Sequence, residues 1–272
     1  MDGFLAFFEQ MPAWQRVLWV MVCLGSSWVV EGGYPLVRLE YRKWRHAGVN
    51  SVFITTSMII NLLFGIATVA AVTWTTEHRF GLIYLVEIPQ WVQLVLVVML
   101  LDLTAQYLAH YLLHHVHWMW RFHVIHHSDR KVDATTGVRL HPGDLAVREV
   151  FALLAMILTG APLAFYLFYR VVTVFFTFLA HANVAAPRWL DSPISLVFVT
   201  PNMHKFHHHF ERPWTDSNYG GIFSLWDRLF RTFVYGDPRT VRYGLDVADG
   251  SRDEDLLYQL ALPFDKNERL TR

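Results

Sequence analysis

The stretch HYLLHHVHWMWRFHVIHH, residues 110–127, decides how this chain folds. A shorter stretch, HKFHHH, follows at residues 204–209 and has the same character. In both stretches histidines recur three or four residues apart, a spacing that places their side chains on one face of a helix. The histidines with this spacing form three sets: His110 with His114, His123 with His126 and His127, and His204 with His207 and His208.

The three sets predict a metal site. Neutral imidazole is a common ligand for iron, zinc, copper and nickel. A single histidine usually has a structural role, but three repeats of one spacing in the same chain speak against that interpretation. Eight histidines exceed the needs of one metal ion and, at about four or five ligands each, suit two. His115, His117 and His209 fall outside the spacing, and we expect them at the surface or beside the site.

The composition is that of a membrane protein. Of the 272 residues, 54% are hydrophobic and 15% are aromatic, which is too apolar for a typical soluble domain. The formal net charge is zero, so no overall basic character points to nucleic acid. Cys23 is the one cysteine, which excludes an internal disulfide and a cysteine-based zinc site. The N-terminus shows no cleavable signal pattern.

Apolar segments predict the fold class. Trp14–Val30, Val52–Trp74 and Trp91–Leu113 are long enough, or nearly so, to cross a membrane as helices. Leu145–Thr159 and Leu163–Leu179 are separated by a Gly-Ala-Pro break and predict a tight helical hairpin that need not cross fully. The expected fold is therefore all-α: a multi-pass membrane bundle of about four to five apolar helices with a histidine-rich cap.

Asp102 lies inside the third apolar segment. A carboxylate is costly in lipid, so we expect this side chain to face protein. Two roles stay open at this point: a buried hydrogen bond that holds helices together, or a residue of the metal site.

We expect a single membrane-embedded domain over residues 1–272. It comprises N-terminal membrane helices over 1–100, the histidine-rich region over 101–233 and a charged tail over 234–272. No internal repeat divides it further.

The basic residues predict the orientation. Lysine and arginine are frequent at 38–45, at 121–139 and after Arg188, but not at the N-terminus or over 75–90. Because basic residues accumulate on the cytosolic side, the histidine sets and the tail from Asp246 should lie there, with the N-terminus outside.

The histidine sets read HxxxH, HxxHH and HxxHH in chain order, and their flanks are also distinctive. With these motifs the chain resembles the fatty acid hydroxylase/sterol desaturase superfamily of integral-membrane di-iron enzymes. The resemblance covers roughly residues 101–233. The flanks that carry it are Asp102 and Tyr107, Trp120-Arg-Phe-His123, Arg139-x-His141-Pro142, His181-x-Asn183, Asn218-Tyr-Gly and Trp226-Asp-Arg-Leu-Phe230.

The resemblance implies roles for individual residues. The eight histidines of the three sets would be metal ligands, His181 a ninth and His141 a weaker tenth. Asp144 stands where relatives often carry glutamate, which leaves the roles of His141 and Asp144 open. The residues expected to support the ligands are Asp102, Trp120, Asn183, Asn218, Tyr219, Trp226 and Asp227.

The resemblance also implies a reaction. Two iron ions, with O2 as co-substrate and two external electrons, would hydroxylate or desaturate a C–H bond of a lipid of sterol or fatty-acyl type, as a monooxygenase of lipid biosynthesis does. The residues alone do not separate iron from zinc, since imidazole binds both, but zinc has no redox chemistry. Two alternatives are a histidine-rich metal transporter and a membrane protein that binds a structural metal. Transport sites usually lie near the middle of the bilayer, whereas these histidines lie at helix ends.

A separate electron donor is expected, because the sequence has no flavin, haem or nucleotide motif. His141-Pro-Gly is similar to a haem-binding motif of cytochrome b5, but no suitably spaced second histidine follows. The donor would be a ferredoxin or cytochrome b5 with its reductase. It would dock on a basic cytosolic face formed by Arg121, Arg130, Lys131, Arg139, Lys205, Arg212 and Arg228.

Overall fold

The computed structural model describes residues 1–245, 250–265 and 270. Helices make up all the regular structure of this part of the chain, apart from two isolated β-bridges, Pro35 with Val184 and Phe198 with Phe223. The predicted all-α class is confirmed. Four helical stretches of the described chain are long and apolar enough to cross a membrane, namely Ala13–Gly33, Lys43–Tyr84, Gln90–His115 and Leu163–His181.

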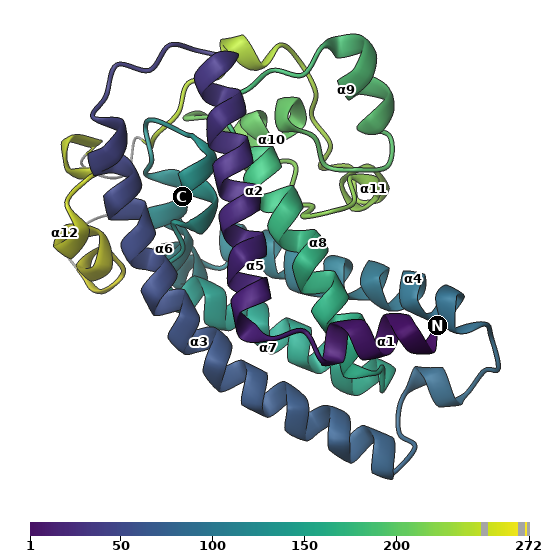
Figure 1. The fold of residues 1–272 in the computed structure, drawn as a ribbon. Coiled ribbons are helices and arrows are strands. Elements are labelled where there is room, and N and C mark those ends of the chain that lie inside the picture. Colours follow the sequence, from purple (N-terminus) through teal and green to yellow (C-terminus); the bar gives the residue numbers. More distant parts are fainter. Residues whose placement is uncertain (246–249, 266–269, 271–272) are drawn as a thin grey trace.

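The first three helices are α1 (Asp2–Glu9), α2 (Ala13–Gly33) and α3 (Lys43–Glu77). α1 lies across the start of α2 and packs against α8, where Phe4 and Phe8 meet Phe168 edge-on (Figure 1). α3 is longer than the predicted span, because the helix begins within the basic cluster rather than after it. A short turn, η1 (Leu82–Tyr84), connects it to the next helix.

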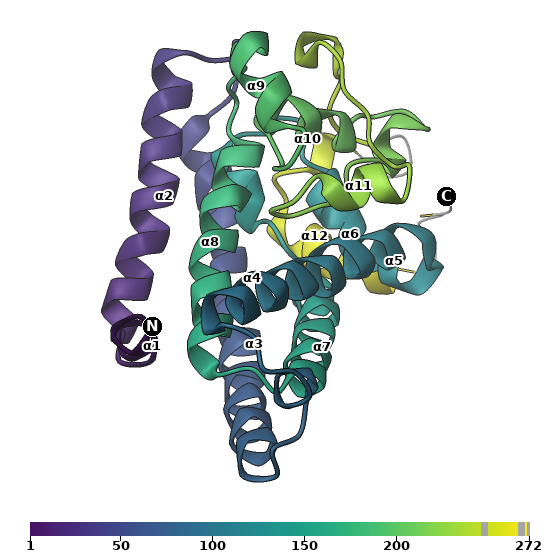
Figure 2. The same cartoon turned by 90° about the vertical axis from the view of Figure 1, so that its right-hand side faces the viewer.

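The third span is one continuous helical stretch with an irregular middle. It comprises α4 (Gln90–Leu101), the π-helical segment η2 (Asp102–Leu108) and α5 (Ala109–His115). Figure 2 shows this stretch lying across α7 and α8 rather than parallel to them. Val116 then adopts an extended conformation, and α6 (His117–His127) turns back toward α5. This corner brings the first two histidine sets together.

The predicted hairpin is present as α7 (Pro142–Thr159) and α8 (Leu163–His181). Gly160 ends α7 in the left-handed conformation, with φ 66°, and a Cβ there would lie 2.1 Å from the Phe80 carbonyl oxygen. Only glycine fits that approach. α7 is not among the candidate spans because it carries Asp144, Arg148 and Glu149, so the described chain has four candidate spans, within the four to five predicted.

The membrane helices pack in two pairs. α3 runs along α7, and α2 runs along α8 (Figures 1 and 2). A core cluster between α4, α7 and α8 includes Leu101, Met156 and Phe165. Burial of such side chains stabilises each by about 1.5–3 kcal/mol.

Short helices build the cap over the spans. In chain order they are η3 (Ala134–Val138), α9 (Arg188–Ile194), α10 (Pro201–His207), η4 (Trp214–Asp216), α11 (Leu225–Leu229), η5 (Pro238–Thr240), η6 (Gly250–Arg252), α12 (Leu256–Ala261) and η7 (Leu262–Phe264).

The charged tail is not simply a surface segment, because part of it is buried. Tyr258, Leu262 and Leu270 are buried against Trp120 and Ile125 of α6. The apolar side chains of α12 account for the difference, because their burial behind α6 outweighs the solvation of the neighbouring charges. Residues 246–249, 266–269 and 271–272 of this tail lie outside the described residues.

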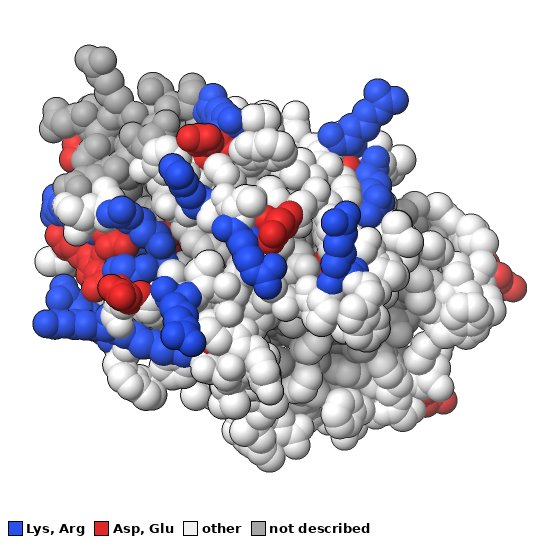
Figure 3. Space-filling model, turned by 90° about the horizontal axis from the view of Figure 1, so that it is seen from above, with Lys and Arg blue, Asp and Glu red and all other residues white. Residues whose placement is uncertain are grey.

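Charged side chains gather on the face seen from above in Figure 3, where lysines and arginines are interspersed with acidic residues. The basic face predicted from sequence is smaller than expected. Arg139 and Lys205 are both 0% exposed, so neither belongs to it. Arg139 donates hydrogen bonds to Ile125 O at 2.9 Å and Asn50 Oδ1 at 3.0 Å, which allows its charge to be buried.

Candidate metal centre

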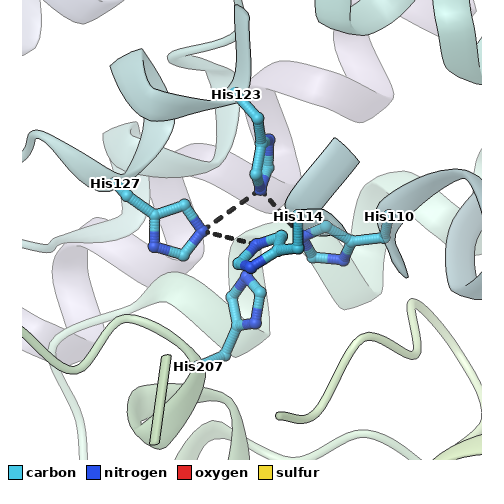
Figure 4. Close-up of side chains that lie close together, drawn as sticks. All are labelled: His110, His114, His123, His127 and His207. Atoms are coloured by element: carbon cyan, nitrogen blue, oxygen red, sulfur yellow. Dashed lines mark hydrogen bonds between the residues drawn. The ribbon is translucent and has the colours of Figure 1, made fainter. Parts of the chain in front are cut away.

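Nine histidines converge at the junction of α5, α6, α8 and α10, and every one is buried. They form two groups, within each of which the ligand atoms lie within 4.8 Å of one another. The five-histidine group, shown in Figure 4, contains His110, His114, His123, His127 and His207. The four-histidine group contains His126, His181, His204 and His208.

Two helices contribute to both groups. On α6, His123 and His127 are four residues apart and join the five-histidine group, whereas His126 points to the other group. On α10 and the residue after it, His204 and His208 are four apart and join the four-histidine group, whereas His207 joins the five. Each HxxHH set is thus divided between the two groups. Their separation is short: the rings of His127 and His208 are stacked with centroids 4.8 Å apart.

Backbone carbonyls fix the orientation of three ligand rings. Nδ1 of His110 lies 3.0 Å from Tyr219 O, Nδ1 of His207 lies 2.7 Å from Ser217 O, and Nδ1 of His181 lies 2.7 Å from Thr177 O. A carbonyl oxygen only accepts, so each Nδ1 must carry the hydrogen. In the neutral ring Nε2 then presents a lone pair, which is the form that binds a metal.

Carboxylates orient two more rings of the five-histidine group. Nδ1 of His123 lies 2.5 Å from Asp144 Oδ2, and Nδ1 of His114 lies 3.2 Å from Asp216 Oδ1. A carboxylate that accepts from a ligand histidine fixes its tautomer and increases its basicity.

The inner nitrogens face one another at distances that neutral rings do not favour. Nε2 of His110 lies 3.0 Å from Nε2 of His123, and Nε2 of His181 lies 3.2 Å from Nε2 of His204. When both Nδ1 atoms carry hydrogens, as in His110 and His123, two lone pairs oppose each other. Burial, followed by repulsion from His181 and His207, holds the pKa of His204 well below its ordinary value, so protonation of His204 does not relieve its contact with His181.

A cation between the rings would satisfy these atoms. Among the described residues, His208 Nδ1 and Nε2 and His207 Nε2 are buried and have no hydrogen-bond partner. Buried polar atoms are normally satisfied, so orphaned nitrogens at a point of convergence indicate a metal ligand. The residues therefore fit two metal ions, with nine imidazoles as donors.

Asp102 accepts hydrogen bonds from the loop that leads into α11 and does not belong to either histidine group. Its carboxylate accepts from Ile222 N at 2.8 Å, Phe223 N at 3.0 Å and Trp226 Nε1 at 3.0 Å. Of the two roles left open by the sequence, the structure favours the buried hydrogen bonds.

Asp227 and Asn218 fix the same loop. Asp227 accepts from Tyr219 N at 2.7 Å and Gly220 N at 3.0 Å. The Asn218 side chain donates to Met203 O at 2.7 Å and accepts from Val234 N at 2.9 Å. These bonds position the Ser217 and Tyr219 carbonyls that accept from His207 and His110.

Trp120 packs against a histidine of the five-histidine group, and Asn183 fixes the end of the helix that carries His181. Trp120 is buried, with its ring centroid 5.3 Å from that of His114. Asn183 donates through Nδ2 to Val37 O at 2.8 Å, which ties the end of α8 to the segment between α2 and α3.

His141, the weaker tenth candidate, lies outside both groups, as do His115 and His117, which were not expected to be ligands. His141 Nδ1 accepts the Gly143 N–H at 3.0 Å, and its ring stacks on Phe122. It therefore caps the start of α7 instead of reaching the ligand groups. His115 and His117 are exposed.

Two supporting residues escaped the sequence interpretation. Asp216 orients His114, but a carboxylate in a polar loop carries no signal of its own. Lys205 was assigned to the surface by its charge, yet its Nζ donates to Ala180 O at 2.8 Å and Ala182 O at 2.7 Å, on either side of His181. Burial lowers the pKa of Lys205 to about 7.

A cavity of about 280 Å³ adjoins the histidines. It lies between the α2/α8 pair and the α3/α7 pair and is lined by residues of all four helices. Part of its wall is formed by four histidines: His110, His126, His181 and His204. Another part of the wall includes Met58 of α3, which is exposed on the outside of the helices. The cavity thus connects both histidine groups with the outer, apolar surface of the helices.

The fatty acid hydroxylase family model matches residues 94–232, about half of the chain. This region contains all nine clustered histidines. The chain therefore belongs to the fatty acid hydroxylase family, and the resemblance expected from the motifs is confirmed.

Curated relatives include ornithine lipid hydroxylase OlsE of Rhizobium tropici, 33% identical over 163 residues, which cover 60% of this chain and 48% of the relative. Alkylglycerol monooxygenases are also similar. The Caenorhabditis elegans protein is 31% identical over 164 residues (58% of this chain and 30% of the relative), and the human protein is 29% identical over 146 residues (51% and 30%). The chain thus spans less than half the length of these relatives. No solved structure matches it significantly.

Proposed function

We propose that the protein is a membrane-bound di-iron oxidoreductase that uses O2 to hydroxylate a C–H bond of a lipid. The observation that carries this proposal is the convergence of nine buried imidazoles in two groups on one cavity that reaches the apolar surface. Bound iron would supply the oxygen activation that no side chain provides. Family membership and the names of the relatives, hydroxylase and monooxygenase, support hydroxylation over desaturation.

The chain's own residues would hold and shield the metals. The five-histidine and four-histidine groups would each bind one iron ion, with Asp144 and Asp216 orienting His123 and His114. Burial of all nine ligands would keep water from the reacting centre, which protects a reactive site from side reactions. The relatives' names, which refer to an ornithine lipid and to alkylglycerols, support a polar lipid as substrate in preference to a sterol.

Electrons would come from a separate protein on the cytosolic side. The gathering of basic residues on one face supports that orientation by the positive-inside rule. Of the seven basic residues expected there, Arg130 and Arg212 are exposed and Lys131 is partly exposed. These would attract an acidic donor of ferredoxin or cytochrome b5 type.

The test combines metal analysis with lipid analysis. Purified protein should contain about two iron ions per chain, the number expected from two ligand groups of four and five. Cells that express it should accumulate a lipid heavier by one oxygen atom, but only under air. His207→Ala and His126→Ala should lose iron and product together, whereas His115→Ala, at an exposed position, should retain both. A fully active sample with zinc and no iron would refute the di-iron proposal.

A metal transporter is the competing function, and the same sample decides it. Transport would move iron across vesicles without consuming O2 and would leave the lipids unchanged. The enclosed, nine-ligand arrangement at helix ends favours a resident metal over a transported one.

A further inference from the structure

The cavity contains charges that are unusual for a lipid-facing space. Three charged residues other than histidine line it, namely Arg148, Glu149 and Arg170. Arg148 Nε donates to Asp144 Oδ1 at 2.8 Å, and Arg170 Nη1 donates to Glu149 Oε1. Each arginine is thus neutralised by a carboxylate of α7. Ionisable residues inside a membrane bundle are costly and generally functional, so their place in the cavity requires an explanation.

The outer pair leaves hydrogen-bond donors unused. Arg170 Nη2 donates to Asn61 Oδ1 at 2.9 Å, across from α8 to α3. This bond occupies the oxygen of the Asn61 amide. Within the described chain, Asn61 Nδ2 and Arg170 Nε have no acceptor, and both residues line the cavity. Neither residue is fully buried, so both donors can be reached from the cavity, and an acceptor oxygen bound there would gain a hydrogen bond.

These donors lie far from the histidines along the cavity. Arg170, Thr173, Thr177 and His181 all line it, and their spacing of three or four residues places them on one face of α8. Arg170 and His181 are eleven residues apart, which corresponds to about 16 Å along a helix axis. Asn61 faces Arg170 from the matching face of α3.

We propose that Asn61 and Arg170 form a polar subsite for an uncharged acceptor oxygen of the substrate, such as an ester carbonyl or a hydroxyl. This inference rests on the proposed function and specifies its substrate. The lipid would place that oxygen at the Asn61–Arg170 end and the carbon to be oxidised at the histidine end, roughly 16 Å away. Phosphate, carboxylate and ammonium groups would remain outside the cavity, because its own charges are already paired.

The test measures binding without turnover. The full-length protein in detergent is titrated with four C18 probes: methyl stearate, 1-octadecanol, octadecane and stearate. Methyl stearate and 1-octadecanol distinguish a carbonyl from a hydroxyl as the preferred acceptor. One or both should bind about tenfold more tightly than octadecane, the difference expected for one hydrogen bond of about 1.4 kcal/mol. Stearate should bind no better than octadecane.

Two variants test the residue directly. Asn61→Leu removes both polar atoms, and Asn61→Asp keeps the oxygen for Arg170 while removing the Nδ2 donor. Either should reduce the preference for the oxygenated probes, because only the Arg170 donors remain, and the aspartate variant is informative even if the leucine variant does not fold. Thr73→Leu is the matched control, because Thr73 lies on the same helix outside the cavity lining and bonds to its own backbone at Val69 O. It should keep the wild-type preference.

Equal binding of octadecane and methyl stearate by the wild-type protein, with no gain for octadecanol, would overturn the subsite. A preference that is undiminished in both Asn61 variants would do the same. Neither result depends on iron or O2. If the protein binds no metal or produces no oxygenated lipid, the oxygenase proposal fails. The relative affinities of the four probes still test the polar subsite on their own.

Discussion

Asp144 connects His123 to an arginine of the cavity wall: its Oδ2 lies 2.5 Å from His123 Nδ1, and its Oδ1 accepts from Arg148 Nε at 2.8 Å. Burial alone would raise the pKa of Asp144, but Arg148 and His123 outweigh it and hold the pKa well below its usual range. The carboxyl is therefore ionised when it accepts from His123.

Asp144→Asn should weaken metal binding at the five-histidine group. The amide keeps the size of the side chain but loses the charge that polarises the His123 ring, and such substitutions typically cost about 10–100-fold in metal affinity. Titration with a chelator, followed by iron analysis, measures the loss. Asp237→Asn, in an exposed turn, is the control. Unchanged iron retention would show that the carboxylate only neutralises Arg148.

His181→Ala and His141→Ala should differ. His181 Nε2 lies 3.1 Å from His126 Nε2 inside the four-histidine group, whereas His141 caps α7. The first variant should therefore lose about one of two metal ions. The second should keep both and lose about 0.5–2 kcal/mol of stability, as for other helix caps. Metal content per chain and thermal unfolding in detergent separate the two effects. Loss of iron in His141→Ala would make it a ligand after all.

Lys205→Met should lower the occupancy of the four-histidine group without touching a ligand. Lys205 satisfies the carbonyls on either side of His181, and their loss would let the end of α8 move. Each buried carbonyl left unsatisfied costs about 1–3 kcal/mol. The spectroscopic signal of the paired metal centre should fall while the single-metal signal rises. A variant that is destabilised but still binds two metal ions would limit Lys205 to a structural role.

The stability of the metal-free protein should fall on acidification. Burial holds the pKa of His126, His204, His207 and His208 well below 6.5 in the folded state, whereas the unfolded chain titrates near 6.5. Below about pH 6.5 the unfolded state therefore binds more protons, and stability decreases as pH falls. Thermal unfolding between pH 8 and pH 5 should show this slope. His208→Phe should reduce it, and an identical slope in that variant would contradict the assignment.

Charge reversal at Arg130 should slow reduction by an acidic donor. Its side chain is exposed, and long-range attraction mainly accelerates encounter. Arg130→Glu should lower donor-supported turnover and its dependence on salt, while turnover with a small chemical reductant stays unchanged. Equal loss with both reductants would mean that the substitution damages the site itself.

The sequence predicts the spans and the set of clustered histidines well, because both depend on local patterns. The spans α2 and α4–α5 follow from long apolar runs with few charges, and the eight set histidines follow from helical spacing. The distribution over two groups does not follow, because the i+3 and i+4 positions lie on either side of position i, and spacing alone does not say which rings of other helices they meet. In the fold, His126 meets His181 of α8, whereas His127 meets His114 of α5.

Charge was the least reliable guide. Arg139 and Lys205 were expected at the surface, but backbone carbonyls far along the chain accept their hydrogen bonds and allow burial. The charged tail also contains apolar residues whose burial the charges conceal: Tyr258 and Leu262 form a hydrophobic core with α6. Such partners are long-range and leave no periodic signal.

Because of the π-helical segment η2, the positions of the metal-site histidines depend on the exact number of residues in the third span as well as on its composition. Asp102, at the start of this segment, anchors the loop that carries the Tyr219 carbonyl, and His110, just beyond its end, donates to that carbonyl. Deleting one residue between them would leave hydropathy almost unchanged but rotate the first ligand pair by roughly 100° about the helix axis. Homologues of this protein should therefore tolerate many substitutions in this interval but neither insertions nor deletions.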